Sequence, residues 1–179
     1  MIGIYGGSFN PVHIGHLIVA EDLVASGKVK EVYFLPCYSQ PLKQDYEIID
    51  FDERCRLILD AIADTPYFHM LDIERHLPKP NYTYNTLLEM RKRVFPPFCF
   101  IMGADNLYII KSWYKYEELF REFKILVIAR PGFKTPDDYS QIGQEEIIPS
   151  RLVDISSTEI RERMKNGLPC RYLKGYARD

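Results

Sequence analysis

The sequence predicts an α/β fold in which a doubly wound, mainly parallel sheet carries helices on both faces. Short apolar runs, typical of buried strands, alternate along the chain with longer segments whose apolar residues recur at helical spacing. This alternation favours a parallel sheet with right-handed crossovers. The 179 residues, 46% of them hydrophobic, suffice to bury a core without disulfides or metals. We therefore expect residues 1–179 to form a single domain, with residues 150–179 as a small C-terminal helical part.

The first third of the chain predicts strand, helix, strand, loop and helix in that order. Residues 1–5 are a short apolar run that ends at two glycines, as a buried strand does. Residues 14–26 have helical spacing followed by a glycine, and residues 31–35 are a second strand ended by a proline. Residues 38–50 are polar and contain a proline, so we expect a mobile loop before the helical pattern of residues 51–63.

The rest of the chain continues the alternation, and prolines and glycines again end many of the elements. The predicted strands are residues 68–73, 98–102, 124–129 and 145–148. The predicted helices are residues 84–94, 113–120 and 157–165. Sheets of this kind bind ligands at the carboxyl ends of their strands, close to the point where the strand order reverses. The chemistry is therefore expected there.

Composition and charge argue against several classes of protein. A net charge of −2 with 27% charged residues disfavours a disordered chain and nucleic-acid binding through bulk charge. No apolar stretch approaches about 20 residues, the length needed to cross a bilayer, and the N-terminus lacks signal-peptide features. The four cysteines, Cys37, Cys55, Cys99 and Cys170, lack metal-binding spacing, so we expect reduced thiols in a cytoplasmic protein. We expect Cys55 and Cys99 in the core.

The first predicted strand and helix are joined by the segment GGSFNPVHIGH, residues 6–16. Its glycines allow a sharp turn and a close approach to a ligand, and the helix N-terminus favours an anion. Ser8 and the backbone amides can donate to phosphate oxygens. His13 and His16 share a helix face, where they can bind a polyphosphate. The alternatives are a metal site, for which no third ligand is obvious nearby, and a helix cap beside an exposed histidine.

A second candidate motif is ISSTEIR, residues 155–161. Ser156 or Ser157 is a good N-cap for the helix that follows. Three successive hydroxyl side chains at a helix N-terminus, with Arg161 one turn later, also form a second phosphate cradle. The alternative is a capped helix and nothing more.

The two motifs together resemble those of a nucleotidyltransferase family. His13-Ile14-Gly15-His16 is similar to the HIGH signature shared by class I aminoacyl-tRNA synthetases and related nucleotidyltransferases. The pair resembles the family that includes nicotinate-nucleotide, nicotinamide-nucleotide and pantetheine-phosphate adenylyltransferases, which implies a Rossmann-like nucleotidyltransferase fold. The resemblance implies that ATP is bound by Gly7, Ser8, Phe9, His13, His16, Ser156, Ser157, Thr158 and Arg161.

Further segments resemble the bacterial nicotinate-nucleotide adenylyltransferases in family order, from residue 2 to about residue 165. The segments are KPNYTYNTL (79–87), similar to RPSYTxDTL; FIMGADNL (100–107), similar to FIxGxDxL; WYKYEEL (113–119), similar to WxxxxxL; and ARPG (129–132), similar to an RPG turn. The resemblance implies a mononucleotide site formed by Asn10, Lys43, Tyr82, Thr83, Asp105, Trp113 and Arg130.

Physical reasoning adds detail to this second site. Trp113, the only tryptophan, can stack on a nicotinate ring or pack in the core. Backbone amides near Tyr82 and Thr83 can bind the ring carboxylate. Asp105 is expected at the end of a buried strand, where a carboxylate needs partners.

The sequence departs from the family pattern at three positions. The usual PPHK or PPHR segment is QPLK at residues 40–43, so Leu42 stands where the histidine is expected while Lys43 is kept. Ser8 replaces a threonine and keeps the hydroxyl group. Asn10 replaces an aspartate and loses its charge. Leu42 puts a role for that histidine in doubt in this chain.

The resemblance implies transfer of AMP from ATP to nicotinate mononucleotide in NAD biosynthesis, with His13, His16, Lys43 and Arg161 as catalytic residues. Mg²⁺ is expected with ATP, held mostly by phosphate and water oxygens rather than by a protein metal site. We expect no nucleic-acid or membrane partner, and a homo-oligomer is compatible with the sequence. A pantetheine-phosphate adenylyltransferase and a non-catalytic nucleotide sensor of the same fold are the alternatives, and the choice between nicotinate and nicotinamide mononucleotide stays open.

Overall fold

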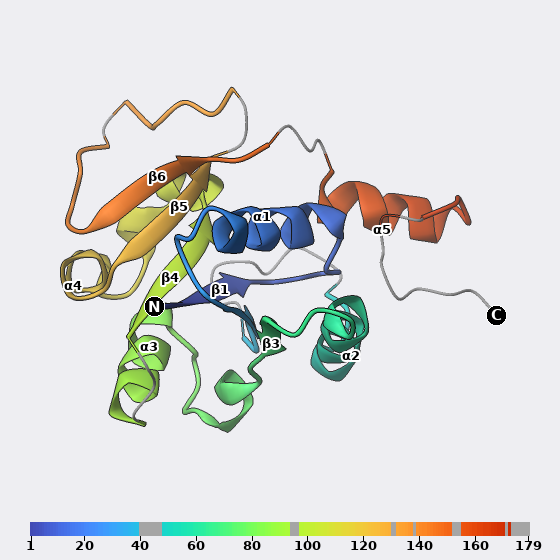
Figure 1. Ribbon diagram of the computed structural model, residues 1–179, viewed down its shortest axis with the longest axis horizontal. Helices are drawn as coiled ribbons and strands as arrows, with labels where there is room; N and C mark the ends of the chain where they lie inside the picture. The colour runs from blue at the N-terminus through green and yellow to red at the C-terminus, as the bar shows by residue number, and fades with distance from the viewer. Residues whose placement is uncertain are drawn as a thin grey trace.

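The computed structural model describes residues 1–39, 48–93, 97–129, 132–137, 139–151, 155–170 and 172 (Figure 1). These residues contain one sheet with the strand order β3-β2-β1-β4-β5-β6, in which all neighbouring strands are parallel. The strands are β1 (Ile2–Gly7), β2 (Val32–Pro36), β3 (Phe68–Met70), β4 (Phe98–Gly103), β5 (Ile125–Ala129) and β6 (Glu145–Pro149). The α-helices are α1 (Ile14–Ala25), α2 (Phe51–Ile62), α3 (Thr83–Lys92), α4 (Tyr116–Glu122) and α5 (Ser157–Lys165).

The strand order reverses between β1 and β4. From β1 the chain adds β2 and β3 on one side, and it then returns to add β4, β5 and β6 on the other. Because β1 and β4 are parallel neighbours, their last residues, Gly7 and Gly103, lie at the same edge of the sheet. The first motif therefore begins at the switch point of the sheet, which is where open α/β sheets bind ligands.

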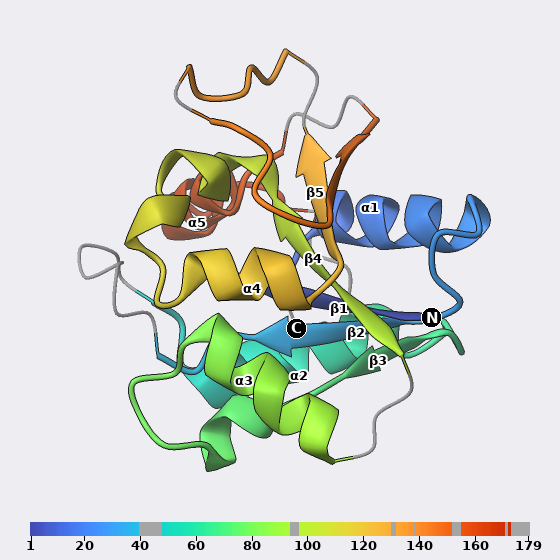
Figure 2. The same ribbon diagram turned by 90° about the vertical axis from the view of Figure 1, so that its left-hand side faces the viewer.

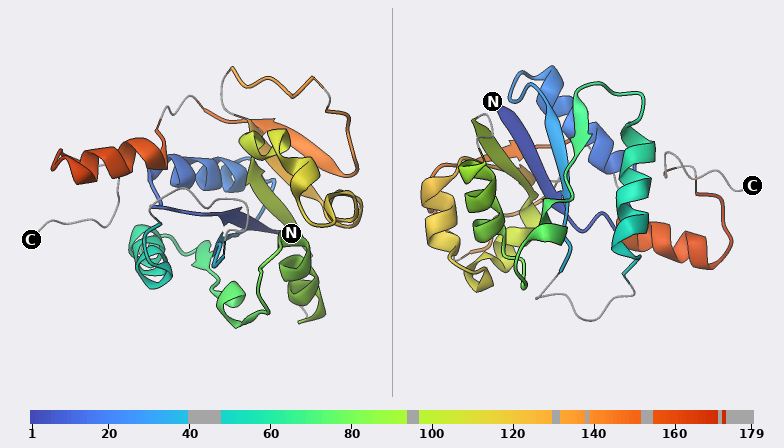
Figure 3. Two further views of the ribbon diagram at one scale, coloured as in Figure 1. Left: turned by 180° about the vertical axis from the view of Figure 1, so that it is seen from behind. Right: turned by 90° about the horizontal axis from the view of Figure 1, so that it is seen from below.

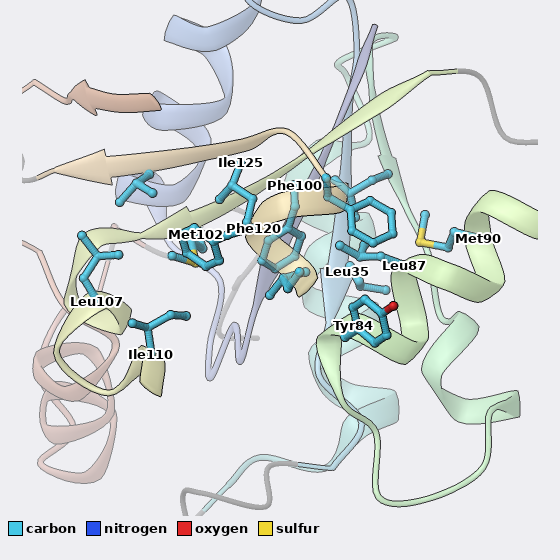
Figure 4. Packing of buried hydrophobic residues seen from close by; sticks show 14 of the residues in the cluster. Leu35, Tyr84, Leu87, Met90, Phe100, Met102, Leu107, Ile110, Phe120 and Ile125 are labelled. Atoms are coloured by element: carbon cyan, nitrogen blue, oxygen red, sulfur yellow. The ribbon is translucent and has the colours of Figure 1, made fainter. Parts of the chain in front are cut away.

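Helices cover both faces of the sheet, as the sequence predicts (Figures 2 and 3). The apolar residues of α1 and α2 pack in one cluster with Cys99 and Ile101 of β4. Those of α3 and α4 pack in the other cluster with Phe100 and Met102, as Figure 4 shows from close by. Successive side chains of a strand point to opposite faces, so β4 contributes to both cores.

Two predicted elements are wrong at their boundaries. The predicted strand over residues 68–73 ends at Met70, because β3 pairs with only three residues of β2 before the chain turns into the 3-10 helix η1 (Ile73–His76). The predicted helix over residues 113–120 begins only at Tyr116. Lys115 before it has φ +53°, a left-handed backbone that a helix cannot continue through.

Two further 3-10 helices, η2 (Ala104–Tyr108) and η3 (Ile110–Ser112), follow β4 and were not predicted. Elements this short show no periodicity that a sequence pattern can detect. The predicted mobile loop at residues 38–50 falls mostly on residues 40–47, which lie outside the described residues, as does the last residue of the predicted helix over 84–94.

Candidate active site

A cavity of about 640 Å³ opens at the carboxyl ends of the central strands, beside the switch point. Most of the residues predicted to bind substrates line it. They come from the first motif, from the start of α3, from the segment after β4 and from the start of α5. They are Gly7, Ser8, Phe9, Asn10, His13, His16, Tyr82, Thr83, Asp105, Trp113, Ser156, Ser157, Thr158 and Arg161. Lys43 and Arg130 lie outside the described residues.

The two histidines of the first motif lie together at the start of α1. His13 is the N-cap residue and is buried, whereas His16 is partly exposed. The backbone N–H of His13 donates to Nδ1 of His16 over 3.2 Å, and the two ring centroids lie 3.8 Å apart. The predicted shared face therefore exists, and both rings line the cavity.

Phe9 connects this motif to the sheet and to His16 through ring contacts. Its backbone has φ +44°, a left-handed conformation that is rare for a bulky residue and must be held by its surroundings. Its buried ring packs with centroid distances of 5.5 Å to Tyr5, 5.5 Å to Phe34 and 5.0 Å to His16. The loop conformation at Phe9 thus influences where the His16 ring lies.

The second motif docks directly on the first. Ser156 is the N-cap of α5, and its Oγ accepts the N–H of Glu159 at 3.2 Å. Ser157 Oγ donates to the carbonyl of Pro11 over 3.1 Å, and Nη1 of Arg161 donates to the carbonyl of Asn10 over 2.7 Å. Figure 1 shows the first turns of α1 and α5 side by side. Two helix N-termini, each of which favours an anion, therefore meet at one cavity.

The other part of the cavity is formed by aromatic and polar side chains. Tyr82 is the N-cap residue of α3, and its ring stacks on Tyr114 with centroids 4.7 Å apart. Thr83 begins the helix, so the first amides of α3 have no partners within the helix. Trp113 is half-buried. It packs against the hydrophobic cluster and also lines the cavity, so it contacts the core and the candidate ligand site at the same time.

One predicted residue has a different environment from the one expected, and another makes an additional hydrogen bond. Asp105 lies in η2, beyond the end of β4, and is exposed, so the expectation of a carboxylate at a buried strand end is wrong. The chain turns into η2 directly after Gly103, which carries Asp105 out of the sheet. Asn10 lines the cavity, but its Oδ1 accepts the N–H of Ile49 at 2.8 Å. The side chain of Asn10 therefore also connects the first motif to the segment before α2.

Two buried charged residues near the cavity were not predicted. Nε and Nη1 of Arg54 donate to the carbonyls of Ile49 and Ser8, and burial lowers the pKa of Arg54. Arg54 lies three residues after Phe51 and four before Ile58, both on the buried face of α2, and this spacing is the signal in the sequence that could have found it.

The second buried charge is Glu74, which lines the cavity. Its carboxylate accepts the N–H of Tyr38 at 2.9 Å and the hydroxyl of Thr86 at 3.1 Å. Burial raises the pKa of Glu74, and these two hydrogen bonds and the charge of Arg54 partly offset that effect. No periodic pattern in the sequence sets Glu74 apart from its exposed neighbours.

Two of the four cysteines lie in the core of the protein. Cys55 and Cys99 are buried, as predicted, and burial raises the pKa of Cys99 to about 11. Within the described part of the chain, no group of three histidine, cysteine, aspartate or glutamate side chains is placed to hold a metal ion. In that same part, no helix has the length and apolar character needed to cross a membrane.

Comparison with known proteins identifies relatives over nearly the whole chain. Residues 4–163 match the family model described as cytidylyltransferase-like. A protein of Bacteroides fragilis named "probable nicotinate-nucleotide adenylyltransferase" is 39% identical over 174 residues, which cover 96% of this chain and 85% of the relative. One of the same name from Flavobacterium psychrophilum is 39% identical over 168 residues, covering 92% and 86% of the two chains.

The fold is similar to that of solved enzymes with related names. The structure of the Plasmodium falciparum nicotinic acid mononucleotide adenylyltransferase, complexed with NaAD, superimposes with a TM-score of 0.73 at 25% sequence identity. The similarity covers 90% of this chain and 82% of that one.

Proposed function

The chain belongs to the cytidylyltransferase-like family and, within it, to the nicotinate-nucleotide adenylyltransferases, and from this premise we propose its reaction and the roles of its residues. It transfers the AMP part of ATP to nicotinate mononucleotide, which yields nicotinate adenine dinucleotide and pyrophosphate in NAD biosynthesis. We further propose that residues 1–179 act as one nucleotidyltransferase domain, with residues 150–179 as its small C-terminal helical part, in the cytoplasm.

The observation that carries this proposal is the docking of α5 on the first motif at the switch point of the sheet. Arg161 and Ser157 donate to the carbonyls of Asn10 and Pro11, so the starts of α1 and α5 converge on one cavity. A triphosphate placed there meets two positive helix ends, the histidine pair and the guanidinium group of Arg161. Gly7, Ser8, Phe9, Ser156 and Thr158 complete the proposed ATP site.

The reaction is an in-line displacement at phosphorus. An oxygen of the mononucleotide phosphate forms a bond to the α-phosphorus of ATP while the bond to the oxygen that bridges to the β-phosphate breaks, and pyrophosphate leaves with that electron pair. Such chemistry depends mainly on positioning and on stabilisation of charge. His16 serves the α-phosphate region and His13 the β- and γ-phosphates or the bridging oxygen. Lys43 and Arg161 neutralise the departing pyrophosphate.

Magnesium enters this scheme as part of the substrate MgATP. The ion is held mostly by phosphate and water oxygens in this proposal.

The mononucleotide occupies the other part of the cavity in this proposal. Trp113 and Tyr82 present flat rings for the nicotinate ring, and the amides at the start of α3, near Thr83, bind its carboxylate. Asp105, exposed at the cavity, organises the sugar and phosphate side of the site together with Asn10, Lys43 and Arg130. Because a helix N-terminus attracts negative charge, this position favours the nicotinate carboxylate over the neutral amide of nicotinamide mononucleotide.

The test is pyrophosphate release from ATP and Mg²⁺ with nicotinate mononucleotide, nicotinamide mononucleotide or phosphopantetheine as acceptor. The proposal expects kcat/KM to be much higher with the nicotinate form. Equal kcat/KM values for the first two acceptors would contradict the proposed contact between the start of α3 and the nicotinate carboxylate. ATP binding without release with any acceptor would favour the nucleotide sensor, and preference for phosphopantetheine would change the substrate class.

A further inference from the structure

Arg54 is a buried cation beside the active site. It projects from the second turn of α2, and its side chain is only 2% exposed. A buried guanidinium group is costly unless its N–H groups have acceptors. Among the described residues no carboxylate forms an ion pair with it; Nη1 instead donates to the carbonyl of Ser8 over 2.7 Å and Nε to that of Ile49 over 2.9 Å. The hydrogen bonds of Arg54 thus go to two backbone carbonyls.

The first of these carbonyls belongs to the motif that we assign to ATP. The Ser8–Phe9 peptide is trans, so its C=O and N–H point in opposite directions. A carbonyl held by Arg54 therefore turns the N–H of Phe9 away from Arg54 and fixes the plane of this peptide. The same bond supports the left-handed backbone of Phe9, which needs such support.

The second carbonyl connects this loop to the chain before α2. Ile49 gives its carbonyl to Arg54 and its N–H to Oδ1 of Asn10, which lies two residues after Ser8. Arg54 and Asn10 thus hold the same loop from two sides. Arg54 does not line the cavity, whereas Ser8, Phe9 and Asn10 all do. The hydrogen bonds of Arg54 therefore act on the substrates through this loop, while its charge also acts on Glu74, which lines the cavity.

We propose that Arg54 is a positioning residue for adenylyl transfer: it fixes the Ser8–Phe9 peptide and, through the Phe9 ring, the place of His16. The ring of Phe9 lies 5.0 Å from that of His16, so a loop that loses its anchor moves a proposed catalytic side chain. This inference rests on the proposed function.

The test compares Arg54→Ala with Arg56→Ala. Arg56 lies on the same helix but at the surface, where it pairs with Glu53 and Asp60. For both variants kcat, the KM of each substrate and the Kd for ATP are measured, with and without guanidinium ion and with sodium chloride of equal ionic strength. Arg54→Lys, which keeps the charge and one donor group, is measured in parallel and replaces Arg54→Ala where that variant does not fold.

For Arg54→Ala we expect kcat to fall about 100-fold, the size of loss that follows a small misplacement of reacting groups. The KM for nicotinate mononucleotide should change far less. Guanidinium should restore part of kcat in Arg54→Ala, whereas sodium chloride should not, and Arg56→Ala should behave as wild type. Arg54→Lys should retain an intermediate kcat.

Two results would overturn the inference. One is a folded Arg54→Ala or Arg54→Lys variant with wild-type kcat and ATP affinity. The other is a loss of activity that matches the unfolded fraction and that guanidinium does not restore, which indicates a purely structural arginine. A wild-type protein that binds ATP but releases no pyrophosphate would contradict the proposed function instead; the inference would then be judged by whether Arg54→Ala weakens ATP binding.

Discussion

At the scale of single residues, hydrogen bonding decides which nitrogen of His16 carries the proton. Nδ1 accepts the backbone N–H of His13, so the ring proton lies on Nε2. A neutral imidazole with Nε2–H is a hydrogen-bond donor, which is what an oxygen gaining negative charge requires. The backbone of the helix start thus prepares the side chain for its proposed role at the α-phosphate.

Replacing His16 tests that role. We expect His16→Ala to lower kcat by about 100- to 1,000-fold, the usual loss when a donor to a developing oxyanion is removed. The KM for nicotinate mononucleotide should change little, because the contact is proposed with ATP. Steady-state pyrophosphate release measures both constants. His69→Ala is the control, since His69 pairs with Glu31 away from the cavity; wild-type turnover in His16→Ala would refute the assignment.

At the scale of elements, the described residues attach α5 to the protein through one buried side chain and a few hydrogen bonds, although α5 carries part of the proposed ATP site. Ile160 is its only buried residue, and Ser157 and Arg161 add hydrogen bonds to the first motif. Each such hydrogen bond contributes a net stabilisation of about 1 kcal/mol, so the burial of Ile160 stabilises the docked helix more than either bond does. An element held this weakly can detach without unfolding the sheet.

Ile160→Ala should therefore release α5 selectively. Loss of a buried isoleucine side chain costs about 2–5 kcal/mol, most of which should fall on the docking of this helix. We expect faster amide hydrogen exchange in α5, unchanged exchange in the central strands and a weaker affinity for ATP. Met164→Ala, a half-buried position of the same helix, is the matched control. Unchanged exchange in α5 and unchanged ATP affinity would show that Ile160 does not anchor it.

The elements also show what the sequence can predict and what it cannot. Strongly periodic or apolar segments are predicted correctly. The two motifs are predicted to form one site because both begin helices with phosphate-binding groups and because the pair resembles a nucleotidyltransferase family, and both line one cavity. The errors occur at element boundaries that the local sequence pattern does not determine. The end of β3 depends on how far β2 extends beside it, and the start of α4 depends on one left-handed residue, Lys115. The hydrogen bonds of Arg54 and Glu74 depend on tertiary packing.

At the scale of the whole molecule, two apolar cores enclose the sheet, and the buried residue Glu74 lines the cavity at its ligand-binding edge. Burial raises the pKa of Glu74 above its ordinary value of 4.5, so the folded protein binds this proton more tightly than the unfolded chain does. The stability that the group contributes is fully present below the ordinary value. It is lost as pH rises through the pKa of the folded state.

Glu74→Gln should remove this pH dependence, because glutamine stays neutral while it can still accept the N–H of Tyr38. The free energy of unfolding of the wild type, relative to the variant, should fall as pH rises above 4.5. Denaturant unfolding over a series of pH values measures this difference.

Glu53→Gln is the control of opposite sign. The hydrogen bond from Arg56 lowers the pKa of Glu53, so the wild type should gain stability relative to that variant as pH rises. Parallel stability curves for the wild type and Glu74→Gln would contradict the account of Glu74.

The central claim is that the AMP part of ATP moves to nicotinate mononucleotide, and the fate of the α-phosphate tests it most directly. ATP carrying an isotopic label in that phosphate is incubated with Mg²⁺, nicotinate mononucleotide and the wild-type protein, and the products are separated. The account predicts the label in nicotinate adenine dinucleotide, with unlabelled pyrophosphate released in equal amount. Label that remains in ATP, or that appears only in free AMP or ADP, would contradict adenylyl transfer.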